Sequence, residues 1–149
     1  MRWTPNSTVA TIIEQDGKLL FVEETDKLSG NVVINQPAGH LEENESLTEA
    51  AIRETLEETG YHCNITHYLG LYIYKAPANN ITYHRHCFIA EATHYNNDYT
   101  LDEGIIRPRW LTTDELIKTG QARSPLIIKC ALDFYQKPAL PLSVIYEHN

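Results

Sequence analysis

Arg53, Glu54, Glu57 and Glu58 lie together in one short stretch of this 149-residue chain. Residues three and four apart share a face of an α-helix, so the three glutamates are expected to converge. Carboxylates that close repel one another unless water screens them or a cation lies between them. Carboxylate oxygens are ligands that Mg²⁺ and Mn²⁺ prefer. The spacing therefore indicates either a solvated acidic surface or a divalent-metal site.

The apolar residues of the same segment favour the metal site. At about 100° per residue, Ala50 and Ala51 share the face of the glutamates, whereas Ile52 and Leu56 lie opposite. A solvated acidic face would instead lie opposite a single apolar stripe. The pattern predicts a helix covered by protein on one side, with its acidic end facing a cleft.

The ends of this helix are marked in the sequence. Ser46 followed three residues later by Glu49 is a capping box, and Gly60 is the residue type that follows a helix C-terminus. The prediction is a helix over residues 47–59. Residues 37–40 predict a loop that leaves a strand and brings backbone groups to the carboxylates.

The stretch from Gly39 to Tyr61 resembles the Nudix box, G-x5-E-x7-R-E-U-x-E-E-x-G-U, in which U is a large aliphatic or aromatic residue. The fixed positions are occupied by Gly39, Glu45, Arg53, Glu54, Glu57, Glu58, Gly60 and Tyr61. One position departs, because Thr55 follows the Arg-Glu pair; this change bears on packing rather than chemistry. The resemblance implies a Nudix hydrolase with an α/β/α sandwich, in which a mixed β-sheet lies between helices.

Segments outside the box are similar to the Nudix subgroup typified by the phosphatase NudJ. They are residues 22–25, 35–42 and 123–126. This likeness implies hydrolysis of phosphoanhydride bonds in nucleoside tri- and diphosphates and in thiamine-type pyrimidine pyrophosphates, with release of phosphate. One alternative is a pyrophosphohydrolase of ADP-ribose, a dinucleoside polyphosphate or a capped RNA end. Others are a non-catalytic nucleotide-sensing module and a prenyl diphosphate isomerase, which would need a cysteine in its pocket.

A formal charge of −8 would repel a polyphosphate substrate unless cations intervened. Mg²⁺, with Mn²⁺ as a substitute, would bridge carboxylates and phosphate oxygens. The ion would also either lower the pKa of a bound water or clamp the attacking and leaving oxygens. We therefore expect Glu54, Glu57 and Glu58 to bind the metal, and family likeness adds the Gly39 carbonyl. Glu54 is also the first candidate to orient or deprotonate the attacking water.

Three further residues could support these glutamates. Arg53 and Glu57 form either a surface ion pair or, as the family implies, an arrangement in which Arg53 holds the glutamates in place. Glu45 could interact with the helix dipole alone. Asp102-Glu103 precedes the strand predicted over residues 105–111 and could form a second acidic site. Many relatives place a metal-binding or base carboxylate before a strand that ends near a Trp, and Glu103 is the candidate here, with a solvated turn residue as the alternative.

Candidates for substrate contact are spread along the chain. Arg85 is a positive charge in an apolar-rich strand, and Arg123 precedes a Ser-Pro helix start, a location that suits anions. Gln36 is included by likeness to the subgroup. Tyrosines that could stack on a base or pack within the sheet are Tyr72, Tyr74 and Tyr83. His40 could contact phosphate or cap the loop. His84 and His86 would share one strand face. A zinc site at these two histidines has no Cys pair to complete its four ligands.

Composition predicts one domain over residues 1–149. The absence of a signal sequence or an apolar run of ~20 residues favours a cytoplasmic protein with no membrane partner. Scattered cysteines indicate reduced thiols, and the lack of a basic stripe excludes a duplex nucleic-acid partner. We expect a monomer or homodimer that acts on a small phosphorylated molecule.

Period-2 segments predict strands over residues 9–14 and 18–24, joined by a turn at Asp16-Gly17, and over 32–36, 65–75, 82–91 and 105–111. A short helix should begin at Thr113 or Asp114 and end near Gly120. A last helix should begin at Ser124-Pro125. Its expected buried stripe is Ile127, Ala131, Phe134 and Tyr135.

Overall fold

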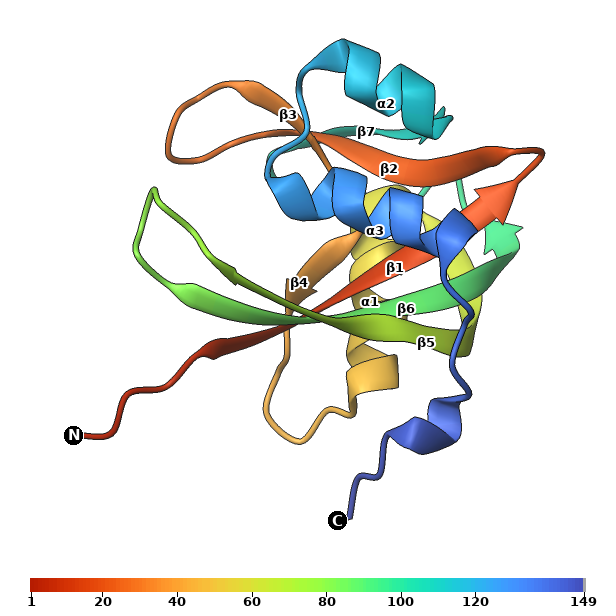
Figure 1. The fold of residues 1–149 in the computed structure, drawn as a ribbon. Coiled ribbons are helices and arrows are strands. Elements are labelled where there is room, and N and C mark those ends of the chain that lie inside the picture. Colours follow the sequence, from red (N-terminus) through yellow and green to blue (C-terminus); the bar gives the residue numbers. More distant parts are fainter. Residues whose placement is uncertain (149) are drawn as a thin grey trace.

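The computed structural model describes residues 1–148 as an α/β structure. Its elements are β1 (Asn6–Gln15), β2 (Lys18–Thr25), β3 (Val32–Asn35), β4 (Ala38–His40), α1 (Leu47–Thr59), β5 (Tyr61–Lys75), β6 (Thr82–Tyr95), β7 (Ile105–Leu111), α2 (Thr113–Thr119), α3 (Pro125–Gln136) and the 3₁₀ turn η1 (Leu142–Val144). Helix α1 lies behind the sheet and α3 in front of it (Figure 1). The predicted fold class, a mixed sheet between helices, is confirmed.

Strand β1 is the centre of the sheet, whose order is β3-β2-β1-β6-β5 with β4 on β1 and β7 on β2. It runs parallel to β6 and antiparallel to β4, and it meets β2 only near their shared turn. That turn places Asp16 and Gly17 at φ 51° and 79°. Positive φ at both positions is what a two-residue hairpin requires, so the predicted hairpin is confirmed.

Both faces of β1 are buried, and successive residues alternate between the two helices. Val9 packs in a cluster with Ala50 and Ala51 of α1. Ala10, the next residue, belongs to the larger cluster that contains Ile127 of α3. The two helices therefore cover opposite faces of β1. On each face, every second residue leads toward the N-terminal end of the strand.

Helix α1 begins and ends where the sequence predicts. The Ser46 hydroxyl accepts from Glu49 N–H, the reciprocal bond completes the capping box, and Gly60 closes the helix at φ 77°. Thr55, the departure from the box pattern, is fully buried. Its hydroxyl lies 2.8 Å from that of Thr11 on β1. A buried polar contact thus replaces the apolar contact expected at this position.

The loop expected over residues 37–40 is wrong in part, since residues 38–40 form β4 and pair with β1. The strands β5 and β6 are longer than predicted because they continue as one antiparallel ribbon. In α3, Ile127 and Ala131 are buried as expected, but Tyr135 is 49% exposed. Asp133 is buried in the stripe instead, where it accepts a 2.7 Å hydrogen bond from Tyr72.

After α3 the chain returns along the edge strand β5. Tyr68 and Leu140 exchange two backbone hydrogen bonds, each 2.9 Å long. The following turn, η1, contributes Leu142 to the cluster under α1. Among the described residues, no helix is both long and apolar enough to cross a membrane.

A Gly60→Ala variant tests how tightly the end of α1 is packed. A methyl group at Gly60 would lie 2.9 Å from the carbonyl oxygen of Asn96, whereas one at Gly120, the equivalent cap of α2, would meet nothing within 4 Å. Both glycines have positive φ. We expect Gly120→Ala to cost about 1 kcal/mol and Gly60→Ala about 2–3 kcal/mol in urea unfolding, because only Gly60 adds a clash. Equal costs would contradict close packing at Gly60.

Candidate metal and substrate site

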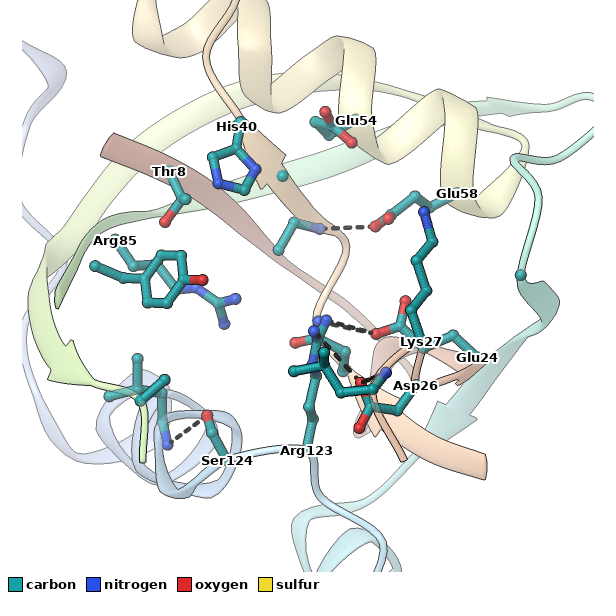
Figure 2. A pocket seen from close by; sticks show the side chains of 18 of the residues that line it. Thr8, Glu24, Asp26, Lys27, His40, Glu54, Glu58, Arg85, Arg123 and Ser124 are labelled. Atoms are coloured by element: carbon teal, nitrogen blue, oxygen red, sulfur yellow. Dashed lines mark hydrogen bonds and ion pairs between the residues drawn. The ribbon is translucent and has the colours of Figure 1, made fainter. Parts of the chain in front are cut away.

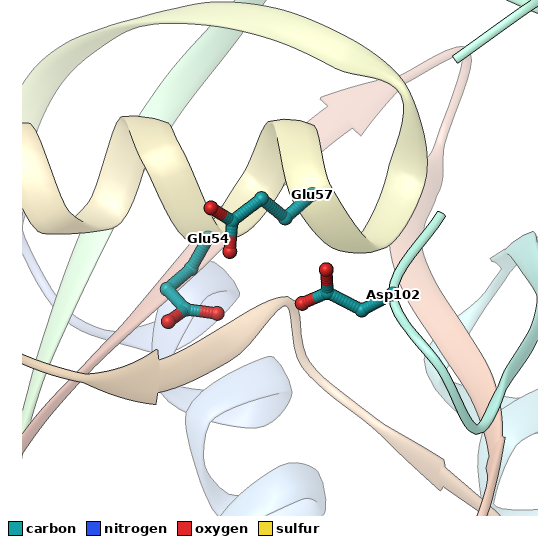
Figure 3. Close-up of side chains that lie close together, drawn as sticks. All are labelled: Glu54, Glu57 and Asp102. Carbon is teal, nitrogen blue, oxygen red and sulfur yellow. The ribbon is translucent and has the colours of Figure 1, made fainter. Parts of the chain in front are cut away.

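Three carboxylates meet at the C-terminal end of α1. Glu54 and Glu57 come from the helix and Asp102 from the segment between β6 and β7, with one ligand atom of each within 4.8 Å of the others (Figure 3). Asp102 is held there because its N–H donates to the carbonyl of Glu57 at 3.0 Å. The segment is also attached at its start, where Asn96 N–H donates to the carbonyl of Gly60 at 2.8 Å.

Arg53 connects these carboxylates to the preceding loop and strand. Its guanidinium donates two hydrogen bonds to Glu45, of 2.6 and 2.9 Å. It also bonds Glu54 at 2.8 Å, Glu57 at 3.2 Å and the carbonyl of His40 in β4 at 3.0 Å. Hydrogen bonding to Arg53 lowers the pKa of Glu45. The alternative of a simple surface ion pair does not describe a side chain that joins three segments.

Gly39 lets Glu54 approach the strand backbone. A methyl group built at Gly39 would overlap the Glu54 carboxylate. Gly39 is also paired with Val9 of β1, so the strand cannot move away without breaking the sheet. Glycine at this position therefore allows a helix carboxylate to lie directly against β4.

The glutamates carry more negative charge than Arg53 can balance. Burial raises the pKa of Glu54 and of Glu57, and the nearby Asp102 charge raises the pKa of Glu57 further. Glu58 is more buried still, and burial raises its pKa well above 4.5. Carboxylate oxygens in a cluster with excess negative charge suit Mg²⁺ or Mn²⁺. Glu54, Glu57 and Asp102 form the only such cluster found in residues 1–148.

Two predicted metal ligands lie outside this cluster. Glu58 accepts a 2.8 Å hydrogen bond from the N–H of Ala38 and faces the adjoining pocket. Glu103 is an exposed turn residue at the edge of that pocket. The turn in which Ile105 N–H donates to the carbonyl of Asp102 separates the two neighbours, so that Asp102 rather than Glu103 meets the helix.

A pocket of about 810 Å³ extends from the carboxylates over the face of the sheet that α3 covers farther along (Figure 2). The sequence-predicted residues that line it are Gly39, Glu54, Glu58, Tyr74, Arg85, Glu103 and Arg123, together with His40 and Tyr83. Gln36 does not line it. It is buried beneath Arg85, whose guanidinium donates to the Gln36 amide oxygen at 3.0 Å.

The other candidates have structural partners. Tyr72 is buried in the core. Arg123 pairs with Glu24 at 3.1 Å and lies 3.8 Å from Asp26. His86 bonds the hydroxyl of Tyr68. No histidine joins a metal-type cluster in the described part of the chain.

Several pocket residues were not predicted from sequence. They include Thr8, Glu24, Asp26, Lys27, Asn35 and Leu126. They come from β1, from β2 and β3 with the turn between them, and from α3, and no spacing pattern links them along the chain. None of the three cysteines lines the pocket, and all are buried. The lining of the pocket therefore has no cysteine, which the alternative of a prenyl diphosphate isomerase would need.

The family model described as the NUDIX domain matches residues 3–129. Phosphatase NudJ of Shigella boydii serotype 4 is 35% identical over 145 residues, which cover 97% of this chain and 93% of the relative. Its counterpart in Escherichia coli K12 is 34% identical over the same length. A solved NUDIX hydrolase from Nitrosomonas europaea is 38% identical with a TM-score of 0.93, covering 97% of this chain and 98% of that one.

Gly39→Ala should weaken metal binding without unfolding the protein. The added methyl displaces only the flexible end of Glu54. We expect about 10–100-fold weaker Mn²⁺ binding, measured by electron paramagnetic resonance, with little change in melting temperature. Gly70→Ala is the control, because its methyl would make ordinary contacts of 3.5 Å or more. Unchanged Mn²⁺ affinity in Gly39→Ala would remove Glu54 from the metal site.

Glu58→Gln should stabilise the metal-free protein at neutral pH. Since burial raises the Glu58 pKa, the folded state holds this proton more tightly than the unfolded chain does. This tighter proton binding contributes to the free energy of unfolding. The contribution is complete below pH 4.5 and is lost as pH rises through the folded-state pKa. The amide removes this loss, and we expect a gain on the order of 1 kcal/mol in urea unfolding.

Glu45→Gln is the control of opposite sign. Arg53 lowers the pKa of Glu45. The contribution of Glu45 to the free energy of unfolding is therefore present above pH 4.5 and is lost as pH falls through the folded-state pKa. Glu45→Gln should therefore destabilise the protein at neutral pH. A loss of stability in Glu58→Gln would show that its hydrogen bond to Ala38 outweighs the burial of its charge.

Proposed function

This chain belongs to the NUDIX domain family and is a Nudix hydrolase, and we propose that it uses Mg²⁺ to cleave phosphoanhydride bonds of nucleoside tri- and diphosphates. The proposal extends to thiamine-type pyrimidine pyrophosphates and to release of phosphate. The observation that carries it is the cluster of Glu54, Glu57 and Asp102 at the end of the pocket. The name Phosphatase NudJ, carried by relatives along nearly the whole length, supports phosphate release.

When bound, Mg²⁺ or Mn²⁺ would neutralise charge on the phosphate oxygens and activate the attacking water. Arg53 fixes the orientation of Glu54 and Glu57 from one side, so that the carboxylates need not reorganise during the reaction. One oxygen of Glu54 bonds Arg53, and the same side chain lines the pocket. Glu54 lines the pocket beside Glu57 and Asp102, and we propose that it orients the attacking water or removes its proton.

Several lining residues of the pocket suit an organic ring. Tyr74 and Tyr83 lie opposite each other on β5 and β6 and both line the pocket. Leu126 of α3 lines it as well. We propose that a base or pyrimidine ring binds here, with Arg85, oriented by Gln36, and Arg123 nearer the phosphates. Acidic and aromatic side chains that line one pocket would bind different parts of the substrate and would thereby favour one orientation of it.

The enzyme is further proposed to act in the cytoplasm, as a monomer or homodimer. Three buried free cysteines support a reducing compartment. Its partners are then small phosphorylated substrates and divalent cations.

Phosphate release over a substrate panel tests the proposal. The panel holds nucleoside tri- and diphosphates, thiamine pyrophosphate and ADP-ribose, each with Mg²⁺ and with excess chelator. We expect Mg²⁺-dependent orthophosphate release that falls by about 10²–10³-fold or more in Glu57→Gln, because one ligand charge is lost. Glu43→Gln is the control, since Glu43 is exposed and lies outside the site. Turnover by Glu57→Gln within a few-fold of wild type would contradict the role of the cluster.

A further inference from the structure

Three polar side chains form a row across the floor of the pocket. Thr8 of β1 is paired with His40 of β4 on one side and with Arg85 of β6 on the other. Cross-strand partners point to the same face of a sheet. The adjacent row on this face, two residues farther along β1 and β6, includes Ala10 and Cys87 and is buried under α3. The polar row, His40, Thr8 and Arg85, is thus the first row beyond the core, and it opens into the pocket (Figure 2).

Thr8 lacks the hydrogen bond that its burial demands. Its side chain is 5% exposed, and its hydroxyl has no partner in the described structure. A buried hydroxyl without a partner destabilises a protein, and such groups are rare in native folds. The Thr8 side chain lines the pocket. A ligand that reaches the floor of the pocket would therefore find an unused hydroxyl donor there.

Arg85 is the charged donor of the polar row. Arg53, Arg107, Arg109 and Arg123 all pair with carboxylates, but within residues 1–148 no carboxylate lies within 4 Å of Arg85. Its one side-chain hydrogen bond goes to Gln36, a neutral acceptor that is 1% exposed. Burial lowers the pKa of Arg85. A guanidinium that is fixed at one nitrogen and lacks a counter-ion is suited to an anion.

His40 connects the polar row to the carboxylate cluster. It directly follows Gly39, against which Glu54 packs, and its carbonyl is held by Arg53. Its ring lies edge-on to Tyr83, 6.2 Å between centroids. The polar row is thus connected through His40 both to the residue against which Glu54 packs and to Tyr83.

We propose that the polar row of His40, Thr8 and Arg85 is a phosphate subsite, which binds one phosphate group of the substrate beside the group held at the carboxylate cluster. The inference rests on the proposed function for the identity of the anion. Thr8 donates one hydrogen bond to a phosphate oxygen, and Arg85 supplies charge and further N–H donors. Gln36 is a positioning residue, because it acts only through Arg85.

Binding of inorganic phosphate to the metal-free protein tests the subsite without catalysis. Isothermal titration calorimetry in excess chelator would compare wild type with Thr8→Val and Arg85→Gln. We expect about tenfold weaker phosphate binding in Thr8→Val, the scale of one hydrogen bond to a charged group, and a larger loss in Arg85→Gln. Because no protein group within residues 1–148 bonds the hydroxyl, Thr8→Val should melt at or above the wild-type temperature.

Thr113→Val is the matched control for Thr8. The Thr113 hydroxyl is also buried without a partner, but it lies on α2 and does not line the pocket. Arg107→Gln is the control for Arg85, since Arg107 is a surface arginine paired with Glu23. Both controls should bind phosphate like wild type. In the Mg²⁺-loaded enzyme, Thr8→Val should raise KM for a nucleoside triphosphate by a similar factor, which separates substrate binding from capture of free orthophosphate.

Three results would overturn the subsite: no phosphate binding by wild type, wild-type affinity in Thr8→Val and Arg85→Gln, or an unchanged KM in Thr8→Val. The first two outcomes are independent of the proposed function, because phosphate binding in excess chelator needs no turnover and Glu57→Gln reports on the carboxylate cluster alone. Glu57→Gln should lose turnover yet bind phosphate at least as well as wild type, since it removes a negative charge near the anion.

Discussion

The site depends on one guanidinium group surrounded by carboxylates. Arg53 bonds glutamates from the loop before α1 and from α1 itself, and it also holds the backbone of β4. Its charge makes it possible to keep Glu54 and Glu57 close together, and its fork geometry fixes their direction. The Glu54 carboxylate that Arg53 holds then occupies the space that a methyl group at position 39 would need. Charge balance and backbone packing are thus one constraint at this end of the molecule.

The sheet adds a second level of organisation to the pocket. Because residues of β1 alternate between α1 and α3, one face of the strand packs against the helix that carries the glutamates, and the other face continues into the floor of the pocket. The parallel pairing of β1 with β6 brings Thr8 and Arg85, far apart in sequence, into adjacent positions. The position of the polar row in the pocket therefore follows from strand register.

The parts of the site that could be predicted from sequence are those within one continuous segment. Capping residues and charge spacing located α1, and the box pattern identified Arg53 and the glutamates. Asp102 could not be distinguished from Glu103, because their separation depends on one turn and on a hydrogen bond to Glu57. Thr8 has no sequence signal at all, since its importance arises from its cross-strand partners. Tyr135 was misplaced because Asp133, a charged residue, takes the buried position through its bond to Tyr72.

The return of the chain along β5 has a consequence for self-association. Strand β5 is the sheet edge next to β6, and an open edge is a template for strands of other molecules. Leu140 occupies the middle of this edge through its two bonds to Tyr68, and three register shifts interrupt the β5–β6 pairing. An incoming strand therefore meets two short, misaligned lengths of backbone rather than one continuous edge. The segment after α3 thus occupies part of the edge at which a strand of another molecule would pair.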